Sequence, residues 1–152
     1  MVALDTNILV YAEGLNGRVM KAASLNLLER LPADATLVPV QVLGELVRVL
    51  VARAKRSPHR ARQAILSWGD AYPIIETSSD ALLAAMDLAA DHRLGIWDAL
   101  ILSTAADARC RLLLSEDLQD GFTWGGVTVT NPFSKSRHPV LERMLHGSGS
   151  KL

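Results

Sequence analysis

The sequence predicts an α/β protein in which helices cover both faces of a mostly parallel β-sheet. Two observations lead to this prediction. Short apolar segments with the length of strands alternate with longer segments in which apolar side chains recur at helical spacing. The chain has 152 residues, of which 49% are hydrophobic and 21% are charged, so we expect one globular domain with an ordinary core.

The first elements are short and are followed by a longer helix. Residues 2–4 are an apolar strand, and residues 7–13 form a first helix or helical turn that two nearby glycines end. From residue 18 to residue 31 apolar residues recur with the spacing of a helix, and Pro32 stops it.

The middle of the chain adds a strand at residues 36–40 and a helix at about 41–55. The pair Ser57-Pro58 predicts the start of another helix, because serine caps a helix N-terminus and proline suits the first helical position. This helix should run to about Trp68. The helix at 41–55 has an apolar face formed by Val42, Leu46, Val49 and Leu50.

The second half of the chain continues the same alternation. A third strand is predicted at residues 72–76, and Ser79 or Asp80 should cap a helix that ends near Gly95. The remaining predicted elements are a helix from about 97 to 109 and strands at 111–115 and 127–130.

The C-terminal segment is polar and is predicted to be a partly disordered tail. We therefore divide the chain into a domain at residues 1–133 and a tail at residues 134–152. The last three residues, Ser150-Lys151-Leu152, match a peroxisomal address, which we interpret as accidental because three residues arise easily by chance.

Composition limits the function classes. The formal net charge is zero, so any contact with nucleic acid must come from a local patch of charge. The apolar segments are too short to span a bilayer, and no basic segment followed by a long apolar one suggests a secretory signal. The single cysteine, Cys110, excludes an internal disulfide and fits a reducing cytoplasm, where we expect this protein. We predict a buried thiol.

Five acidic residues stand out because of where they fall in the predicted elements. Asp5 follows the first strand, Asp117 follows the fourth, and Asp120 comes three residues later. The carboxyl ends of parallel strands share one edge of a sheet, where ligands bind in such folds. Glu45 and Asp98 lie in apolar helices that must pack on this sheet. The sequence therefore predicts that acids gather at this edge.

Each of these acids also has a purely structural interpretation. Asp5 could cap a helix, and Asp98 could be a first-turn acid that the helix dipole favours. Glu45 could face solvent, and the two later acids could be loop residues. The combination favours a common site, because two acids fall at one edge of the sheet and two interrupt apolar helices.

Carboxylates gathered in one place need a counter-ion. Two unit charges 4 Å apart repel by roughly 4 kcal/mol at an effective dielectric constant of about 20. Oxygen ligands without clustered cysteine or histidine favour Mg²⁺ or Mn²⁺ over zinc, and such an ion suits phosphodiester chemistry. The four histidines are scattered along the chain: His59, His92, His138 and His146.

The predicted ligands have different ranks. Asp5 and Asp98 are the central ligands, and Glu45 and Asp117 complete the site directly or through water. The predicted supporting residues are Asn7 and Ser115, whose short polar groups could orient the carboxylates, and Asp120 at the rim.

Four segments of the chain resemble PIN-domain ribonucleases, in order and in spacing. They are LDTNILVY, the helix around Glu45, IWDALILSTA, and LLLSEDLQDG followed by NPF. The resemblance covers about residues 2–133 and is closest to the toxin half of VapBC-type toxin–antitoxin pairs. The tail after Phe133 departs from the family pattern.

The resemblance implies a three-layer α/β/α sandwich with a five-stranded parallel sheet. It also implies Mg²⁺- or Mn²⁺-dependent endoribonuclease activity, a homodimer and inhibition by a small cognate antitoxin. The family's catalytic and metal-binding acids correspond one by one to Asp5, Glu45, Asp98 and Asp117.

The segment from Arg48 to Arg62, between the second and third predicted strands, is basic and contains no acid. It could be a solvated helical hairpin or a rim that contacts RNA phosphates beside the acids, and we favour the second interpretation. No aromatic residue lies within it, so it does not itself indicate base stacking. The candidate RNA-binding residues are Arg48, Arg53, Lys55, Arg56, Arg60 and Arg62.

Other function classes are less consistent with the motifs. A phosphatase of the haloacid dehalogenase type needs a second aspartate at the position of Asn7, and a dinucleotide-binding enzyme needs a glycine-rich turn after the first strand. A PIN-type RNA-processing nuclease that is not a toxin remains an alternative, as does an inert interaction or nucleic-acid-binding domain.

Overall fold

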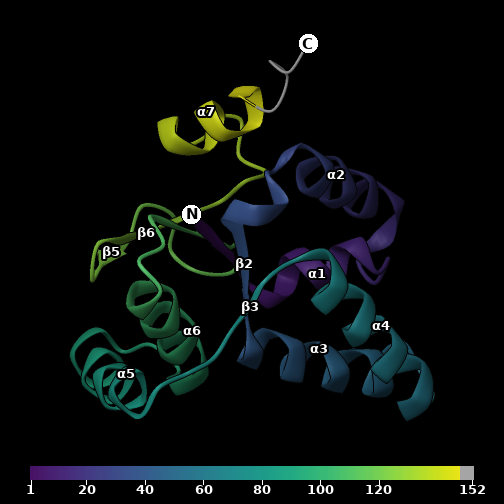
Figure 1. Cartoon of the computed structure of the whole chain (residues 1–152), viewed down its shortest axis with the longest axis horizontal. Coiled ribbons are helices and arrows are strands. Elements are labelled where there is room, and N and C mark those ends of the chain that lie inside the picture. Colours follow the sequence, from purple (N-terminus) through teal and green to yellow (C-terminus); the bar gives the residue numbers. More distant parts are fainter. Residues whose placement is uncertain (148–152) are drawn as a thin grey trace.

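The structure, a computed structural model, describes residues 1–147. They form a six-stranded sheet in the order β3-β2-β1-β4-β6-β5, in which all neighbouring strands are parallel except β5 and β6 (Figure 1). The predicted α/β class with a mostly parallel sheet is confirmed, but the sheet has six strands instead of five. The strands are β1 (Val2–Leu4), β2 (Thr36–Pro39), β3 (Ile74–Ile75), β4 (Leu112–Leu114), β5 (Thr123–Trp124) and β6 (Val127–Thr130).

The strand that the sequence did not predict is β5. It is only two residues long and pairs with β6 through a tight turn at Gly125 and Gly126. These glycines have φ angles of 56° and 81°, which glycine adopts without the strain that a side chain would add. A two-residue strand is too short for an alternating pattern, which explains why the sequence did not indicate it.

The helices lie on both faces of the sheet. In Figure 1, α1 to α4 lie on one side of it, and α5 and α6 pack against each other on the other side. The helices are α1 (Thr6–Ala12), α2 (Gly17–Arg30), α3 (Val40–Ala52), α4 (Pro58–Ala71), α5 (Ser79–His92), α6 (Ile96–Asp107) and α7 (Pro139–Gly147), with a short 3₁₀ turn at Ala33–Ala35. None of the helices in residues 1–147 is both long and apolar enough to cross a bilayer.

Two helix starts show how local sequence fixes the element boundaries. The Ser57 hydroxyl accepts a hydrogen bond from the Arg60 amide at 3.2 Å, and Pro58 is the first helical residue of α4, as predicted. Helix α5 begins slightly earlier than expected, because the Ser78 hydroxyl accepts a hydrogen bond from the Ala81 amide at 3.0 Å.

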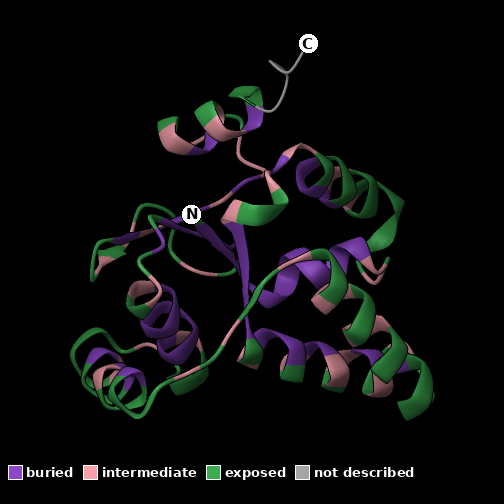
Figure 2. Cartoon of the chain, in the orientation of Figure 1, coloured by how far each residue is buried: buried purple, intermediate pink, exposed green. Residues whose placement is uncertain are grey.

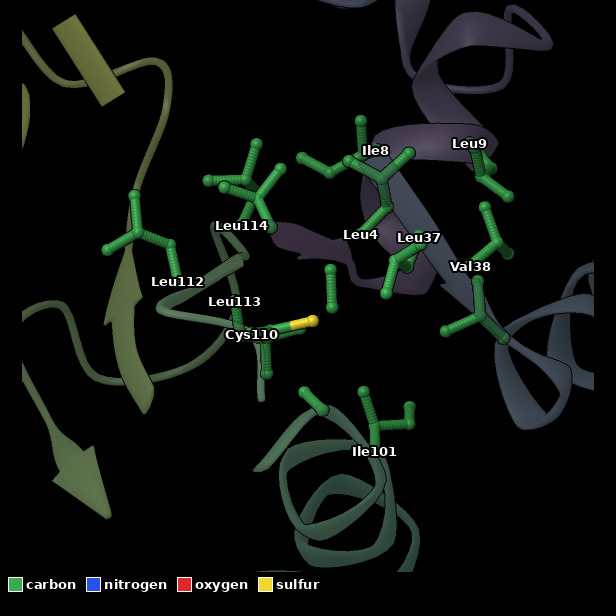
Figure 3. Close-up of a cluster of buried hydrophobic side chains, with 14 of the residues drawn as sticks. Leu4, Ile8, Leu9, Leu37, Val38, Ile101, Cys110, Leu112, Leu113 and Leu114 are labelled. Carbon is green, nitrogen blue, oxygen red and sulfur yellow. The ribbon is translucent and has the colours of Figure 1, made fainter. Parts of the chain in front are cut away.

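The core surrounds β1 and β4, which are buried along their whole length (Figure 2). Figure 3 shows Leu4 and Leu114 of these strands in one apolar cluster with Ile101 of α6 and with Cys110. Cys110 is buried, so the predicted buried thiol is confirmed, and burial raises the pKa of this thiol to about 11. The predicted apolar face of α3 also packs into the core, with Val42, Leu46 and Leu50 fully buried and Val49 partly so.

The C-terminal segment differs from the prediction. Residues 139–147, which were expected to belong to a partly disordered tail, form α7 instead, and this helix contacts α2. Its apolar side chains Leu141 and Leu145 are buried, and Arg137 just before it donates a hydrogen bond to the Pro132 carbonyl at 2.9 Å. The sequence did not indicate this helix because the segment is polar on average, which hides two leucines spaced one helical turn apart. The predicted peroxisomal match lies outside the described residues.

The burial of α7 leads to a stability prediction. Replacing Leu141, which is fully buried, with alanine should lower the free energy of unfolding by about 2–5 kcal/mol, because the substitution removes buried methyl groups and leaves a cavity. Urea denaturation measures this change, and Arg143→Ala on the exposed side of the same helix is the matched control. A loss for Leu141→Ala of less than about 0.5 kcal/mol would show that α7 does not dock stably.

Candidate active site

Asp5 joins the end of β1 to the start of α1. Its backbone amide donates to the Leu114 carbonyl at 2.9 Å, which continues the pairing of β1 with β4. Its carboxylate oxygen Oδ1 accepts the Thr6 amide at 2.7 Å and so caps α1. Asp5 is therefore a helix cap, as the structural interpretation of the sequence suggested, and its second carboxylate oxygen is still available for other contacts.

That second oxygen, Oδ2, is held by two buried donors. The Ser115 hydroxyl donates to it at 2.6 Å and the Asn7 side-chain amide at 3.1 Å. The Asn7 side-chain nitrogen also donates to a carboxylate oxygen of Asp117 at 3.3 Å. The Asn7 side-chain oxygen accepts the Glu116 backbone N–H at 3.2 Å. Asn7 thus links the ends of β1 and β4. The structure brings both predicted supporting residues, Asn7 and Ser115, into contact with Asp5.

Glu45 reaches the same edge of the sheet from α3. This helix begins directly after β2, so its second turn lies beside the carboxyl ends of the central strands. The Thr6 hydroxyl donates to Glu45 Oε2 at 3.0 Å and positions the carboxylate next to the start of α1. The sequence did not indicate Thr6, because a threonine after a predicted cap carries no distinctive signal.

The carboxylates lie close enough to influence each other's ionisation. Burial raises the pKa of Asp5 to about 6, although the hydrogen bonds from Ser115 and Thr6 lower it, and the charges of Asp98 and Glu45 raise it further. Asp98 is half-buried in the first turn of α6, and its pKa is raised by burial and by the charge of Asp117. The predicted quartet of acids therefore shares one electrostatic environment.

Two hollows lie on either side of Glu45, which lines both of them. The larger has a volume of about 570 Å³ and lies between α3 and the start of α6; the smaller has a volume of about 300 Å³ and lies beside α1. The larger hollow is lined by Gln41, Gly44, Glu45, Arg48, Gly95, Trp97 and Asp98. The smaller is lined by Thr6, Asn7, Val10, Tyr11, Asn16, Glu45, Val49, Arg53 and Asp117.

The donor set fits a hard divalent cation by its chemistry. All candidate ligands are carboxylate oxygens, and Asp5 is 5% exposed yet forms no ion pair with any cationic side chain in residues 1–147. Within the same residues, no three acids, histidines or cysteines are already drawn together closely enough to enclose a metal ion. The acids therefore border an opening and do not form a closed cage.

Asp120, predicted at the rim, has a structural partner. Its carboxylate accepts the Asn131 amide at 2.9 Å and so ties the loop after β4 to the residue that follows β6. Asp120 lines neither of the two hollows at the acids. Its participation in the site remains a prediction without geometric support.

The candidate basic residues separate into two groups. Arg48 and Arg53 line the larger and the smaller hollow, respectively. Arg56 instead forms a salt bridge with one carboxylate oxygen of Glu13, at 2.7 Å. The other carboxylate oxygen of Glu13 accepts the Trp68 indole N–H at 2.8 Å. The remaining candidates, Lys55, Arg60 and Arg62, are exposed and line neither hollow.

The structure also identifies residues near the acids that the sequence did not indicate. The Tyr11 hydroxyl donates to Glu116 at 2.9 Å, and burial together with this carboxylate raises the pKa of Tyr11 to about 12. Gln41 and Trp97 line the larger hollow, and Trp97 is 64% exposed. The only sequence signal for Trp97 is a large aromatic residue directly before a candidate ligand.

Solved structures with a similar fold include toxins of toxin–antitoxin systems. A toxin–antitoxin complex from Klebsiella pneumoniae matches with 24% identity over 88% of this chain and 98% of that chain, at a TM-score of 0.65. VapC20 from Mycobacterium tuberculosis, described as a sarcin-ricin loop cleaving toxin, matches with 17% identity over 77% of this chain and 90% of that chain, at a TM-score of 0.64. FitAcB from Neisseria gonorrhoeae matches with 20% identity over 88% of this chain and 99% of that chain, at a TM-score of 0.59.

These similarities concern the fold, because the identities are low. None of the curated proteins compared with the chain matches it. The family model of the PIN domain matches residues 2–119, a segment that contains β1 to β4, α1 to α6 and all four acids described above. Since this match spans most of the chain, the protein belongs to the PIN domain family.

Proposed function

We propose that this PIN domain is a Mg²⁺- or Mn²⁺-dependent endoribonuclease that hydrolyses RNA phosphodiester bonds in the cytoplasm. The observation that carries this proposal is the buried carboxylate of Asp5. It accepts three hydrogen bonds, has no cationic partner in residues 1–147, and lies in the field of Glu45 and Asp98. A folded protein gains nothing structural from such repulsion, but a divalent cation would reverse its sign.

The residues divide into ligands and supporting groups. Asp5 and Asp98 would hold the ion, and Glu45 and Asp117 would complete the site directly or through water. Asn7 and Ser115 fix the orientation of Asp5 through the hydrogen bonds that they donate to it. The ion would supply positive charge that makes a nearby water more acidic and stabilises the leaving oxygen.

Arg48 and Arg53 are suited to hold the RNA backbone. They line the two hollows that Glu45 also lines, so a strand that crosses the acids would meet a cationic residue on each side of the scissile phosphate. We assign this role to Arg48 and Arg53 in preference to Arg56, because the guanidinium of Arg56 is already paired with Glu13.

A role as the toxin of a type II toxin–antitoxin pair extends this proposal. Its support is the fold shared with a toxin–antitoxin complex from Klebsiella pneumoniae and with VapC20, described as a sarcin-ricin loop cleaving toxin. We propose a cognate antitoxin as the protein partner, and a homodimer through the apolar side chains that α5 exposes, Leu82, Leu83 and Met86. An RNA-processing PIN nuclease that is not a toxin would use the same site.

The first test is RNA cleavage by site variants. Asp5→Asn and Asp98→Asn should each lower the cleavage rate of single-stranded RNA in Mn²⁺ by more than about 100-fold, because each replaces a charged ligand with a neutral group of the same size. Asp120→Asn should cleave at the wild-type rate, because the Asp120 carboxylate holds a loop through the Asn131 amide. Cleavage by Asp98→Asn at the wild-type rate, with folding verified by circular dichroism, would exclude Asp98 as a central ligand.

Metal binding should be measurable without cleavage. At a hundredfold excess over its dissociation constant, Mn²⁺ should stabilise the fold by about 2.7 kcal/mol, which corresponds to a rise in melting temperature of roughly 5–10 °C. EDTA should reverse this rise, and the double variant Asp5→Asn/Asp98→Asn should show none. A wild-type melting temperature that is indifferent to millimolar Mn²⁺ would contradict the metal site.

The pKa of Asp5 predicts a pH dependence of the metal-free protein. Because burial raises this pKa from 3.8 to about 6, the folded state holds the proton more tightly than the unfolded state does. The stabilisation by the protonated form is therefore lost as the pH rises through about 6. Between about pH 4.5 and about pH 7, metal-free wild type should lose about 2 kcal/mol more unfolding free energy than Asp5→Asn does.

Urea denaturation of both proteins at the two pH values measures this difference, and their shared acids cancel in the comparison. An equal loss in the two proteins would show that Asp5 ionises in the folded state as readily as in the unfolded chain.

A further inference from the structure

The larger hollow is lined in part by Gln41, Gly44 and Trp97, to which the proposed cleavage assigns no role. Gln41, Gly44, Glu45 and Arg48 follow one another at the spacing of a single face of α3, and Trp97 faces them from the start of α6. The hollow is thus lined by a glutamine, a glycine, a glutamate and an arginine of α3 and by a tryptophan at the start of α6.

Trp97 is the most unusual of these groups. An indole is among the largest apolar surfaces that a side chain can offer, yet Trp97, which directly precedes Asp98 in the chain, is 64% exposed. A flat aromatic surface next to a phosphodiester-cleaving site suits the face of an unstacked nucleobase, because stacking on an aromatic side chain tolerates any base.

Gln41 adds an unsatisfied polar group. Its side-chain oxygen is buried and accepts no hydrogen bond within residues 1–147. An unpaired amide oxygen is costly, and a modest rotation of the side chain toward the hollow would let the amide pair with the polar edge of a base. A purely apolar occupant would leave this cost in place.

The remaining wall provides room and charge. Gly44 lines the hollow, and a methyl group at its Cα would meet no atom within 4 Å, so the helix leaves open space at this position. Arg48 follows one turn later and can bind the phosphate of the nucleotide whose base enters the hollow. A base, an edge contact and a phosphate contact therefore fit in one connected space of about 570 Å³.

We propose that this hollow is a nucleotide-binding subsite for one unstacked base of the RNA strand. Trp97 stacks on the base, Gln41 hydrogen-bonds to its edge, and Arg48 binds its phosphate. This inference rests on the proposed function, because it assigns the neighbouring nucleotide of the same substrate, and it makes single-stranded RNA the preferred form. Gln41 is the residue that distinguishes one base from another.

The test is a binding scan in EDTA, where cleavage cannot interfere. A short fluorescently labelled single-stranded oligoribonucleotide is titrated at low salt, with an abasic nucleotide placed at each position in turn. In wild type, one abasic position should weaken binding by about 5- to 150-fold, the range that loss of a stacked base causes.

Trp97→Ala should weaken binding of the intact strand by a similar factor and should abolish the sensitivity to that abasic position, as expected for two parts of one contact. Trp97→Phe should keep most of the affinity, because it retains an aromatic face. Leu66→Ala, which removes an exposed apolar side chain on α4, should change nothing. Gln41→Leu should preserve the abasic sensitivity while making the four bases at that position bind alike.

The outcomes separate the inference from the proposed function. RNA cleavage by wild type, together with an abasic scan that Trp97→Ala leaves unchanged, would overturn the subsite and leave the nuclease proposal intact. This result would indicate that Trp97 contacts a protein instead. Failure of wild type to bind the strand in EDTA would overturn the subsite as well, and cleavage in Mn²⁺ would then decide the nuclease proposal independently.

Discussion

The hydrogen bonds around the Asp5 carboxylate connect the sheet, the first helix and the site. One oxygen starts α1, and the other accepts donors from Asn7 and from Ser115 at the end of β4. A carboxylate taken out of water is tolerated only when donors replace its hydration, and here three donors do so. Because the pKa of Asp5 is nevertheless raised, this replacement is incomplete. A positive charge at the edge where the central strands end would therefore stabilise the ionised Asp5 carboxylate further.

Parallel topology explains why acids distant in sequence meet at this edge. Since β1, β2 and β4 are parallel neighbours, their carboxyl ends point the same way, and the segments that follow them must begin side by side. Asp5 and Asp117 follow two of these strands, and Glu45 lies in the helix that follows the third. Asp98 comes from the opposite layer, where α6 begins. A metal held here would therefore join both helical layers across the sheet.

The sequence predicted the alternation of strands and helices well, because this alternation depends on patterns longer than a few residues. It also indicated that the four acids lie near one another at one edge of the sheet, while their role in a site stays a prediction. It predicted β6 at its exact bounds and the start of α4 from two residues, Ser57 and Pro58. It could not predict contacts formed by tertiary packing alone, such as the bond of Thr6 to Glu45 or the position of Trp97 opposite α3. It also treated the basic segment as uniform, since the pairing of Arg56 with Glu13 joins residues far apart in the chain.

If the chain acts on RNA as proposed, the pairing of Glu13 with both Arg56 and Trp68 has a consequence for how the protein would encounter nucleic acid. Glu13 neutralises the Arg56 guanidinium just before the N-terminus of α4. This pairing reduces the positive surface to which any polyanion would bind regardless of its sequence. Because the formal net charge of the chain is also zero, there is little long-range attraction between the protein and a polyanion. Such a protein would release incorrect strands quickly and spend most of its time unbound. Its selectivity would then depend on the few contacts at the site itself and not on prior capture by charge.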